Sequence, residues 1–252
     1  MKKSAYILIA ALLVSLVAAC NRVPNEINSP EDVEGRIIGG LEGTPSLRLA
    51  DELGTAISFT SPNDMMAELR AGNIACAIME RTTALELVSN TPGVRILYEP
   101  LVEYELRFAI ALENRGLLNA VNAALDELGR NGTLRGLVNK YFSRGNFRYV
   151  SPEDDEPRTR TLLIALPPDS PPFSFKGEDG RFTGMDVEIA VAVSDILGVN
   201  LEVVENDAWD LVTAVWHGRA DMALGWHPGE GEGIVRKSEP YATAVHVIIV
   251  RR

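Results

Sequence analysis

The sequence predicts an α/β protein with two lobes of similar construction. A pattern of helix, glycine and strand occurs at residues 64–80 and again at residues 210–226. Both segments are 17 residues long, begin with Asp, and carry Gly at the ninth position and Ala at the fourteenth. A chain of 252 residues is long enough for two modest domains that each bury a core. We interpret the repeat as one unit in each lobe; the alternative is one pattern occurring twice by chance.

The repeated segments also indicate where a ligand would bind. Apolar residues recur at helical spacing before Gly72 and Gly218, which end the helices, and the short apolar runs that follow are typical of buried strands. Ligands of open α/β sheets bind beyond the carboxyl ends of the strands. This position holds Trp226 and His227 in one lobe and Glu80 in the other. We therefore expect an aromatic shelf that faces a carboxylate across a cleft.

Composition excludes several classes of protein. The chain is 46% hydrophobic and 23% charged, as in globular proteins, and its net charge is −11. This charge disfavours nucleic acid as a partner, because nucleic-acid affinity depends on Lys and Arg, whereas a cationic ligand is compatible with it. The sequence contains no visible set of nucleophile and base, and no cluster of metal ligands. We expect no catalytic residue, metal or cofactor.

The first 19 residues are predicted to be a signal peptide. A positively charged start precedes an apolar run that is short for a membrane span and ends in small residues before Cys20. This arrangement resembles a lipoprotein cleavage box, which implies that Cys20 carries acyl chains and anchors the protein to a membrane. The alternative is an ordinary secretory signal followed by a chance cysteine. Residues 20–32 form a polar tether, and Cys76 is expected to be a buried thiol without a disulfide.

Residues 33–105 are predicted to form one lobe. Thr44 is placed to cap a helix that Pro45 opens, and the backbone N–H groups of such a helix start also suit a ligand carboxylate. Thr44 and Ser46 are therefore candidate ligand contacts. Glu80 ends a strand, where it can contact ligand or merely favour the start of the next helix. The strands expected here are 36–41, 56–59 and the run before Glu80, with a further strand at 104–112.

Residues 106–252 are assigned to the other lobe. They comprise helices within 114–142, separated near Gly129 and Gly132, an exposed acidic linker at 143–160, and the segment 161–252. In that last segment the strands are expected at 161–166, 201–204 and 243–250, with a hairpin between Gly180 and Gly184. A proline-rich loop follows the first of these strands and contains the candidate contacts Asp169 and Ser170. Asp186 is predicted to cap a helix over 187–197 and to be structural.

Several segments resemble the polar-amino-acid type of periplasmic solute-binding protein, family 3. The segments are 174–190, 211–221, 238–241, 34–36 with 43–44, and 131–142. The resemblance covers nearly all of residues 33–252 and implies a two-lobed periplasmic-binding-protein-like (type II) fold. The order is circularly permuted, because the family's first lobe corresponds to residues 161–252 and its second lobe to about 33–105. This order implies that linker 143–160 joins the usual ends and that only the segment 104–112 crosses between lobes.

The resemblance also implies ligand contacts. Glu80 corresponds to the acid that grips a ligand's α-amino group, and Thr44 and Ser46 to the turn that binds its α-carboxylate. Gly225 and Trp226 correspond to positions that bind ligand backbone atoms.

Other positions depart from the family pattern. The carboxylate-clamping Arg would fall near Gly231, where no Arg stands, and Arg236 is the nearest. Pro167 replaces an acidic residue, Ser170 replaces an aromatic one, and Trp209 stands one place late. Loss of a bidentate clamp weakens the case for a carboxylate.

We interpret the chain as an extracytoplasmic solute-binding lipoprotein, expected to be a monomer. It would capture a small polar solute, an amino acid or related amine, for the permease of an ABC importer. Glu80 with Trp226 or Trp209 suits an amine through charge pairing and cation–π contact, although either Trp can instead be a core residue. His227 is either a hydrogen-bonding contact or a surface residue. The alternatives are an enzyme like the cyclohexadienyl dehydratases, with Glu80 as general acid, and a sensor for a membrane kinase.

Overall fold

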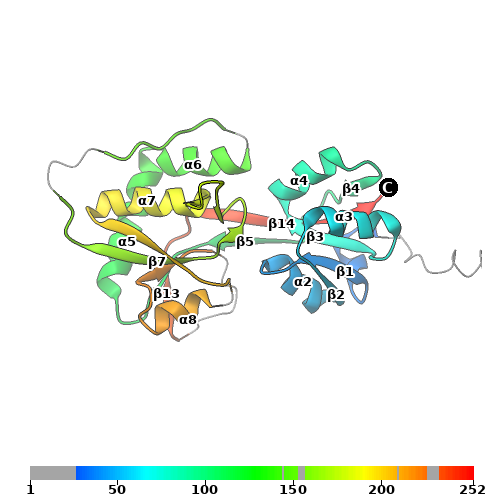
Figure 1. The fold of residues 1–252 in the computed structure, drawn as a ribbon, viewed down its shortest axis with the longest axis horizontal. Helices are drawn as coiled ribbons and strands as arrows, with labels where there is room; N and C mark the ends of the chain where they lie inside the picture. Colours follow the sequence, from blue (N-terminus) through cyan, green and yellow to red (C-terminus); the bar gives the residue numbers. More distant parts are fainter. Residues whose placement is uncertain (1–26, 144, 153–156, 209, 226–232) are drawn as a thin grey trace, which may run out of the picture. The chain divides into compact units, whose positions relative to one another are not determined.

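A computed structural model describes residues 27–143, 145–152, 157–208, 210–225 and 233–252. The chain divides into two compact units (Figure 1). Unit 1 contains the residues up to Glu80, Ala84–Leu101 and His246–Arg252. Unit 2 contains Arg81–Thr83 and Val102–Val245. Both are mixtures of helices and strands, so the predicted α/β class with two lobes is confirmed.

Unit 1 is a sheet with helices on both faces. Its elements are a 3₁₀ turn Pro30–Val33, β1 (Ile37–Leu41), α2 (Pro45–Leu53), β2 (Thr55–Phe59), α3 (Pro62–Ala71), β3 (Cys76–Glu80), α4 (Arg81–Asn90) and β4 (Val94–Ile96). The strand order is β2-β1-β3-β14-β4, where β14 (Ala242–Arg251) also pairs with β5 (Val102–Leu106). Strands β1, β2 and β3 run parallel, and β14 runs antiparallel to β3.

Two adjacent glycines in β1 let the helices approach the sheet. A Cβ atom on Gly39 would lie 2.7 Å from the Ile74 side chain and 3.0 Å from that of Met65 on α3. A Cβ atom on Gly40 would lie 2.4 Å from the backbone Cα of Leu47 on α2. Successive strand residues point to opposite faces, so α3 covers one face of β1 and α2 the other.

Unit 2 contains a second sheet with the order β11-β7-β12-β6-β13 and a small sheet β10-β9-β8. Its elements are β6 (Ala109–Ala111), α5 (Arg115–Arg130), α6 (Thr133–Phe142), β7 (Thr161–Leu166), β8 (Asp169–Ser170), β9 (Ser174–Lys176), β10 (Phe182–Thr183), α7 (Met185–Leu197), β11 (Asn200–Glu205), α8 (Leu211–Trp216), β12 (Met222–Ala223) and β13 (Val235–Lys237). Helices α5, α6 and α7 pack into one apolar cluster and α8 into another. The sheet therefore has a core on each face.

The repeated pattern of helix, glycine and strand is confirmed in both units. Helix α3 ends at Gly72 with φ 86°, and β3 follows. Helix α8 is followed by Gly218 with φ 68°, and then by β12. Both glycines adopt the left-handed conformation that other residues rarely reach, which explains why they end the helices.

Two local predictions were wrong. The expected strand 104–112 is two strands, β5 and β6, each with its own partners. Asp186 does not cap its helix, because α7 begins at Met185 with Gly184 at the cap position. Gly184 has φ 122°, and a Cβ atom there would lie 2.3 Å from the Phe173 carbonyl oxygen, so only glycine fits. Asp186 is instead buried in the first turn of α7.

The linker 143–160 is exposed at most of its described residues, as expected, but a few of its side chains attach it to unit 2. The ring of Phe147 packs against Gly136 of α6, where an added Cβ atom would lie 2.5 Å from it. Tyr149 donates its hydroxyl to Asp195 Oδ2 at 2.9 Å, and Arg158 Nη1 lies 2.8 Å from Asp195 Oδ1. The side chains of Arg158 and Asp195 are only 13% and 5% exposed. The linker is therefore attached to α6 through Phe147 and to α7 through Tyr149 and Arg158.

The last residues of the final strand belong to a different unit from the one expected. Residues 106–252 were assigned together, but His246–Arg252 belong to unit 1. The second half of β14 is apolar and pairs with β3 and β4 of that unit, which explains the difference. Apart from the short segment Arg81–Thr83, the chain passes between the units after Leu101 and again within β14, whereas a single crossing segment at 104–112 was expected. Leu101 N donates to His246 O at 2.9 Å, so the two passages lie side by side.

Candidate functional site

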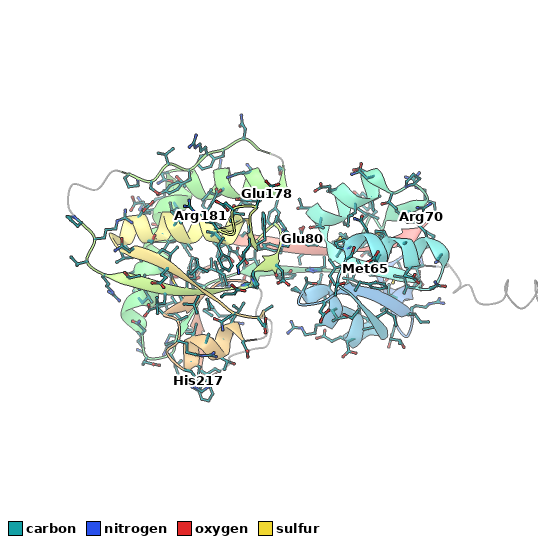
Figure 2. All side chains as sticks on the ribbon, viewed as in Figure 1. Met65, Arg70, Glu80, Glu178, Arg181 and His217 are labelled. Carbon is teal, nitrogen blue, oxygen red and sulfur yellow. The ribbon has the colours of Figure 1, made fainter. Side chains whose placement is uncertain are left out.

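The first set of candidate residues gathers at one edge of the sheet in unit 1. Strands β1 and β3 are parallel, so their carboxyl ends, Leu41 and Glu80, lie at the same edge. Register pairs Ile38 with Cys76, and alternation then places Gly40 and Glu80 on the face that α2 covers. Glu80 is a buried carboxylate, 8% exposed, and Figure 2 labels it at the end of β3. The turn that starts α2 and Glu80 therefore share one face and one edge.

The hydroxyls of Thr44 and Ser46 are engaged within this turn. Thr44 Oγ1 donates to Leu41 O at 2.8 Å, and Leu41 N donates to Ser46 Oγ at 3.0 Å. The two hydroxyl oxygens lie 2.6 Å apart, so Ser46 is the donor between them. Each hydroxyl hydrogen is thus already used, and neither remains to donate to a ligand carboxylate in this arrangement.

His246 lies directly opposite Glu80. The antiparallel register of β14 and β3 pairs these two residues, and His246 is 2% exposed. Directly opposite residues in a sheet share a face, with Cβ atoms about 4.5–5.5 Å apart. Burial lowers the pKa of His246 to about 4, so its imidazole is neutral at neutral pH. The sequence analysis did not identify this residue, although a histidine in the otherwise apolar run 244–250 was a visible signal.

The second set of candidates gathers at the corresponding edge in unit 2. Strands β7 and β12 are parallel, so the loop after Leu166 and the residues after Ala223 emerge together. This edge carries Asp169, which is exposed, Ser170, which is half-buried, and Gly225. Pro167 O accepts a hydrogen bond from Ser174 Oγ at 2.7 Å, and Ser170 O accepts from Phe173 N at 2.9 Å. These bonds hold the loop against β9.

Gly225 is held by a series of buried hydrogen bonds. The Gly225 N–H donates to the hydroxyl oxygen of Tyr241, and that hydroxyl donates to Asp186 Oδ1 at 2.9 Å. Asp186 is 1% exposed, and burial raises its pKa to about 7. Burial also raises the pKa of Tyr241. This chain links the start of the loop after β12 to the core of unit 2.

Not all predicted contacts can be placed. Trp209, Trp226, His227 and Gly231 lie outside the described residues. Arg236, the nearest replacement for a carboxylate clamp, lies on β13 and donates its Nε to Leu112 O at 2.8 Å. Strand β13 is separated from β12 by β6, so Arg236 does not lie on the strands that carry Asp169 and Gly225.

One polar group at the unit 2 edge was not anticipated. Asn206 follows β11, and its backbone N–H donates to Leu166 O at 3.1 Å. Its Oδ1 atom is buried without a hydrogen-bond partner within the described part of the chain. Asparagine just after a predicted strand is the signal that could have identified it.

Within the described ranges, the chain has neither a cluster of metal ligands nor a membrane-spanning helix. No group of three or more His, Cys, Asp or Glu side chains there could hold a metal ion. None of the helices in the described ranges is long and apolar enough to cross a membrane.

Comparison with known proteins supports the family resemblance for the last part of the chain. Residues 162–252 match bacterial extracellular solute-binding proteins, family 3. The chain is 27% identical over 147 residues to the L-cystine-binding protein TcyJ of Escherichia coli strain K12, and equally to that of E. coli O6:H1. This alignment covers 56% of the chain and 55% of TcyJ, so the chain spans about half the length of the curated relatives it matches. The name describes the relative as a binding protein for L-cystine.

Two solved structures are similar over most of their length. A phosphate-binding protein of a phosphate ABC transporter from Streptococcus pneumoniae TIGR4 is 12% identical, with a TM-score of 0.48, and the match covers 86% of the chain and 89% of that structure. An ancestral cationic amino acid solute binding protein is 11% identical, with a TM-score of 0.46, and the match covers 88% and 84%.

Proposed function

We propose that this chain is an extracytoplasmic solute-binding protein that captures a small polar solute with an amine group for an ABC importer. The observation that carries the proposal is the buried carboxylate of Glu80 at the carboxyl edge of unit 1. The family match supports solute binding, and the name of the curated relative indicates an amino acid or a related compound. Attachment to a membrane through Cys20 stays a prediction of the sequence.

The candidate contact residues favour recognition of an amine group over recognition of a carboxylate. A cation stabilises a buried carboxylate, and an ammonium or guanidinium group of a ligand could do so at Glu80. The hydroxyl hydrogens of Thr44 and Ser46 are already used, and Arg236 binds the chain beside β6. Glu80 is therefore a stronger candidate for binding an amine than these side chains are for binding a carboxylate.

Glu80→Gln is expected to weaken the binding of amine ligands at least tenfold. A hydrogen bond to a charged group contributes about 1.5–3 kcal/mol, which corresponds to at least a tenfold weaker Kd. A thermal-shift screen of amino acids, polyamines and other amines would identify the best ligand, since binding raises Tm by mass action. Titration calorimetry with that ligand then measures the variant.

Glu42→Gln is the matched control, because Glu42 lies in the turn of the same unit but is exposed. The control variant should keep the wild-type Kd. An unchanged Kd in Glu80→Gln, or equal losses in both variants, would contradict the role of Glu80.

We also infer that the chain is circularly permuted relative to its family. The matched residues 162–252 follow the segments that resemble the family's second lobe and last helices. Two ends of the described chain meet on β4: Arg95 Nη2 lies 3.4 Å from Asn28 Oδ1, and Arg252 N lies 2.9 Å from Gly93 O. This proximity is what the family's continuous order requires.

A chain rearranged to the family's order is expected to fold and to bind the same ligand. Its residue 252 would be joined to residue 27 by a short Gly/Ser linker, and the chain would be opened within 153–156, so that neither docked end of the linker is lost. Circular dichroism and the ligand-induced shift in Tm measure the outcome. Opening the chain between Ile164 and Ala165, inside β7, should prevent folding. Failure of both rearranged chains would count against permutation.

A further inference from the structure

His246 and Glu80 form a buried pair that no part of the family resemblance assigns. The two residues are direct partners in the register of β14 and β3, and both are buried. Partners at one level of an antiparallel pair have side chains on the same face, close enough to interact. The next partners along the same face are Ile78 and Ile248, which are both fully buried. On β3, Glu80 is therefore the polar neighbour of His246.

A histidine is unexpected at this buried position of β14. The residues that follow it in β14, from Val247 to Val250, are buried and aliphatic, so an apolar side chain would suit the strand equally well. Burying a polar ring costs free energy unless its nitrogen atoms find hydrogen-bond partners. A carboxylate on the opposite strand is an acceptor that a neutral imidazole N–H can use.

We propose that His246 is a positioning residue for Glu80, which it orients through an imidazole N–H while leaving the carboxylate charge available to a cationic ligand group. This inference rests on the proposed function of Glu80. Burial keeps His246 neutral at neutral pH, because its pKa falls to about 4. A protonated imidazole would neutralise a carboxylate at Glu80, whereas a neutral imidazole does not. The pair therefore selects a solute with an ammonium or guanidinium group.

The first test uses the ligand-free protein and does not depend on ligand identity. Long-range ¹H–¹⁵N spectra at pH 7 report the charge and tautomer of each imidazole, and the spectrum of His246→Asn assigns His246 among the three histidines. We expect a neutral ring in one tautomer whose nitrogen shifts change in Glu80→Gln and stay unchanged in Glu42→Gln. A charged ring, or shifts that do not respond to Glu80→Gln, would overturn the proposal.

The second test measures binding of L-lysine, L-arginine and putrescine by calorimetry. His246→Leu should weaken the best of these by about tenfold, whereas His246→Asn, which keeps an N–H donor, should retain most of the affinity. On a Glu80→Gln background, His246→Leu should have no further effect. Thermal unfolding of each variant reports whether the strand stays folded. A loss that is equal in His246→Leu and His246→Asn, or that persists without Glu80, would indicate a structural role only.

The two tests separate the inference from the proposed function. If none of the three probes binds the wild-type protein but the His246 signals respond to Glu80→Gln, the pair is correct and the amine ligand is wrong. If a probe binds through Glu80 but the His246 signals do not respond, the proposed function stands and the positioning role is wrong.

Discussion

Gly40→Ala is expected to unfold unit 1 or to leave it only marginally stable. A Cβ atom at this position would lie 2.4 Å from Leu47 Cα, 2.7 Å from Leu47 N and 2.9 Å from Ser46 C. All three are backbone atoms of α2, so no side chain can rotate away, and the helix itself must move. Overpacking of a core costs about 1–3 kcal/mol, and we expect the upper part of this range or more, because the whole first turn of α2 is displaced. That turn also contains the bonds from Ser46 and Thr44 to Leu41.

The rate of chemical labelling of Cys76 measures the opening of unit 1 alone. It is the only cysteine after Cys20, it is buried in β3, and burial raises its pKa to about 12, so it should react with maleimide only when the unit opens. In a form that lacks Cys20, Gly40→Ala should label much faster than the wild-type protein. All three tryptophans lie within the range of unit 2, and their fluorescence shows whether that unit stays folded.

Gly129→Ala is the matched control for glycine replacement. Gly129 lies inside α5, and a Cβ atom there would meet nothing within 4 Å. Alanine is a better helix former than glycine by about 0.8–1.0 kcal/mol, so this variant should be as stable as the wild-type protein or more stable. Wild-type labelling rates in Gly40→Ala would show that α2 can shift away from β1 at little cost.

The local parts of the fold were readable from the sequence because local rules determine them. The left-handed glycines 72 and 218 end helices wherever they stand, and Pro45 in the first turn of a helix needs no partner from elsewhere in the chain. The predicted strand ends place Glu80 and the turn at Thr44 after two strands, and because these strands are parallel both positions lie at one edge of the sheet. Each of these predictions depends on a few neighbouring residues.

The parts that could not be predicted depend on pairings between distant residues. Strand β14 reads as an ordinary apolar strand, and only its pairing with β3 reveals that it ends in unit 1 and that His246 faces Glu80. Asp186 looks like a helix cap in the sequence, and its actual partner, Tyr241, is 55 residues away. The linker is exposed, as its polarity predicts, but its attachment to Asp195 on α7 through Tyr149 and Arg158 could not be predicted. Strand register and tertiary contacts determine these pairings, and neither can be predicted from local composition.

Asp186→Asn is expected to make unit 2 more stable at pH 8 than the wild-type protein, and to change its stability little at pH 4. Asp186 is fully buried, and although Tyr241 donates to its Oδ1, the Oδ2 atom has no hydrogen-bond partner among the described residues. Burial raises its pKa from 3.8 to about 7, so the folded state holds the proton over a pH range in which the unfolded state has lost it. The free energy of unfolding therefore decreases as pH rises from about 4 to about 7, by at most about 1.4 kcal/mol for each pH unit from this group. Asparagine carries no charge at any pH, and its Oδ1 can still accept from Tyr241, so the variant lacks this decrease.

Urea unfolding followed by tryptophan fluorescence measures this effect in unit 2. The difference in unfolding free energy between Asp186→Asn and the wild-type protein should become more favourable to the variant from pH 4 to pH 8. Comparing variant with wild type cancels the other groups that titrate in this range. Asp179→Asn is the control for replacing an aspartate, because Asp179 lies in an exposed turn of the same unit. A difference for Asp186→Asn that does not vary with pH would mean that the carboxyl is ionised in the folded protein at acidic pH, and that a donor outside the described residues stabilises its charge.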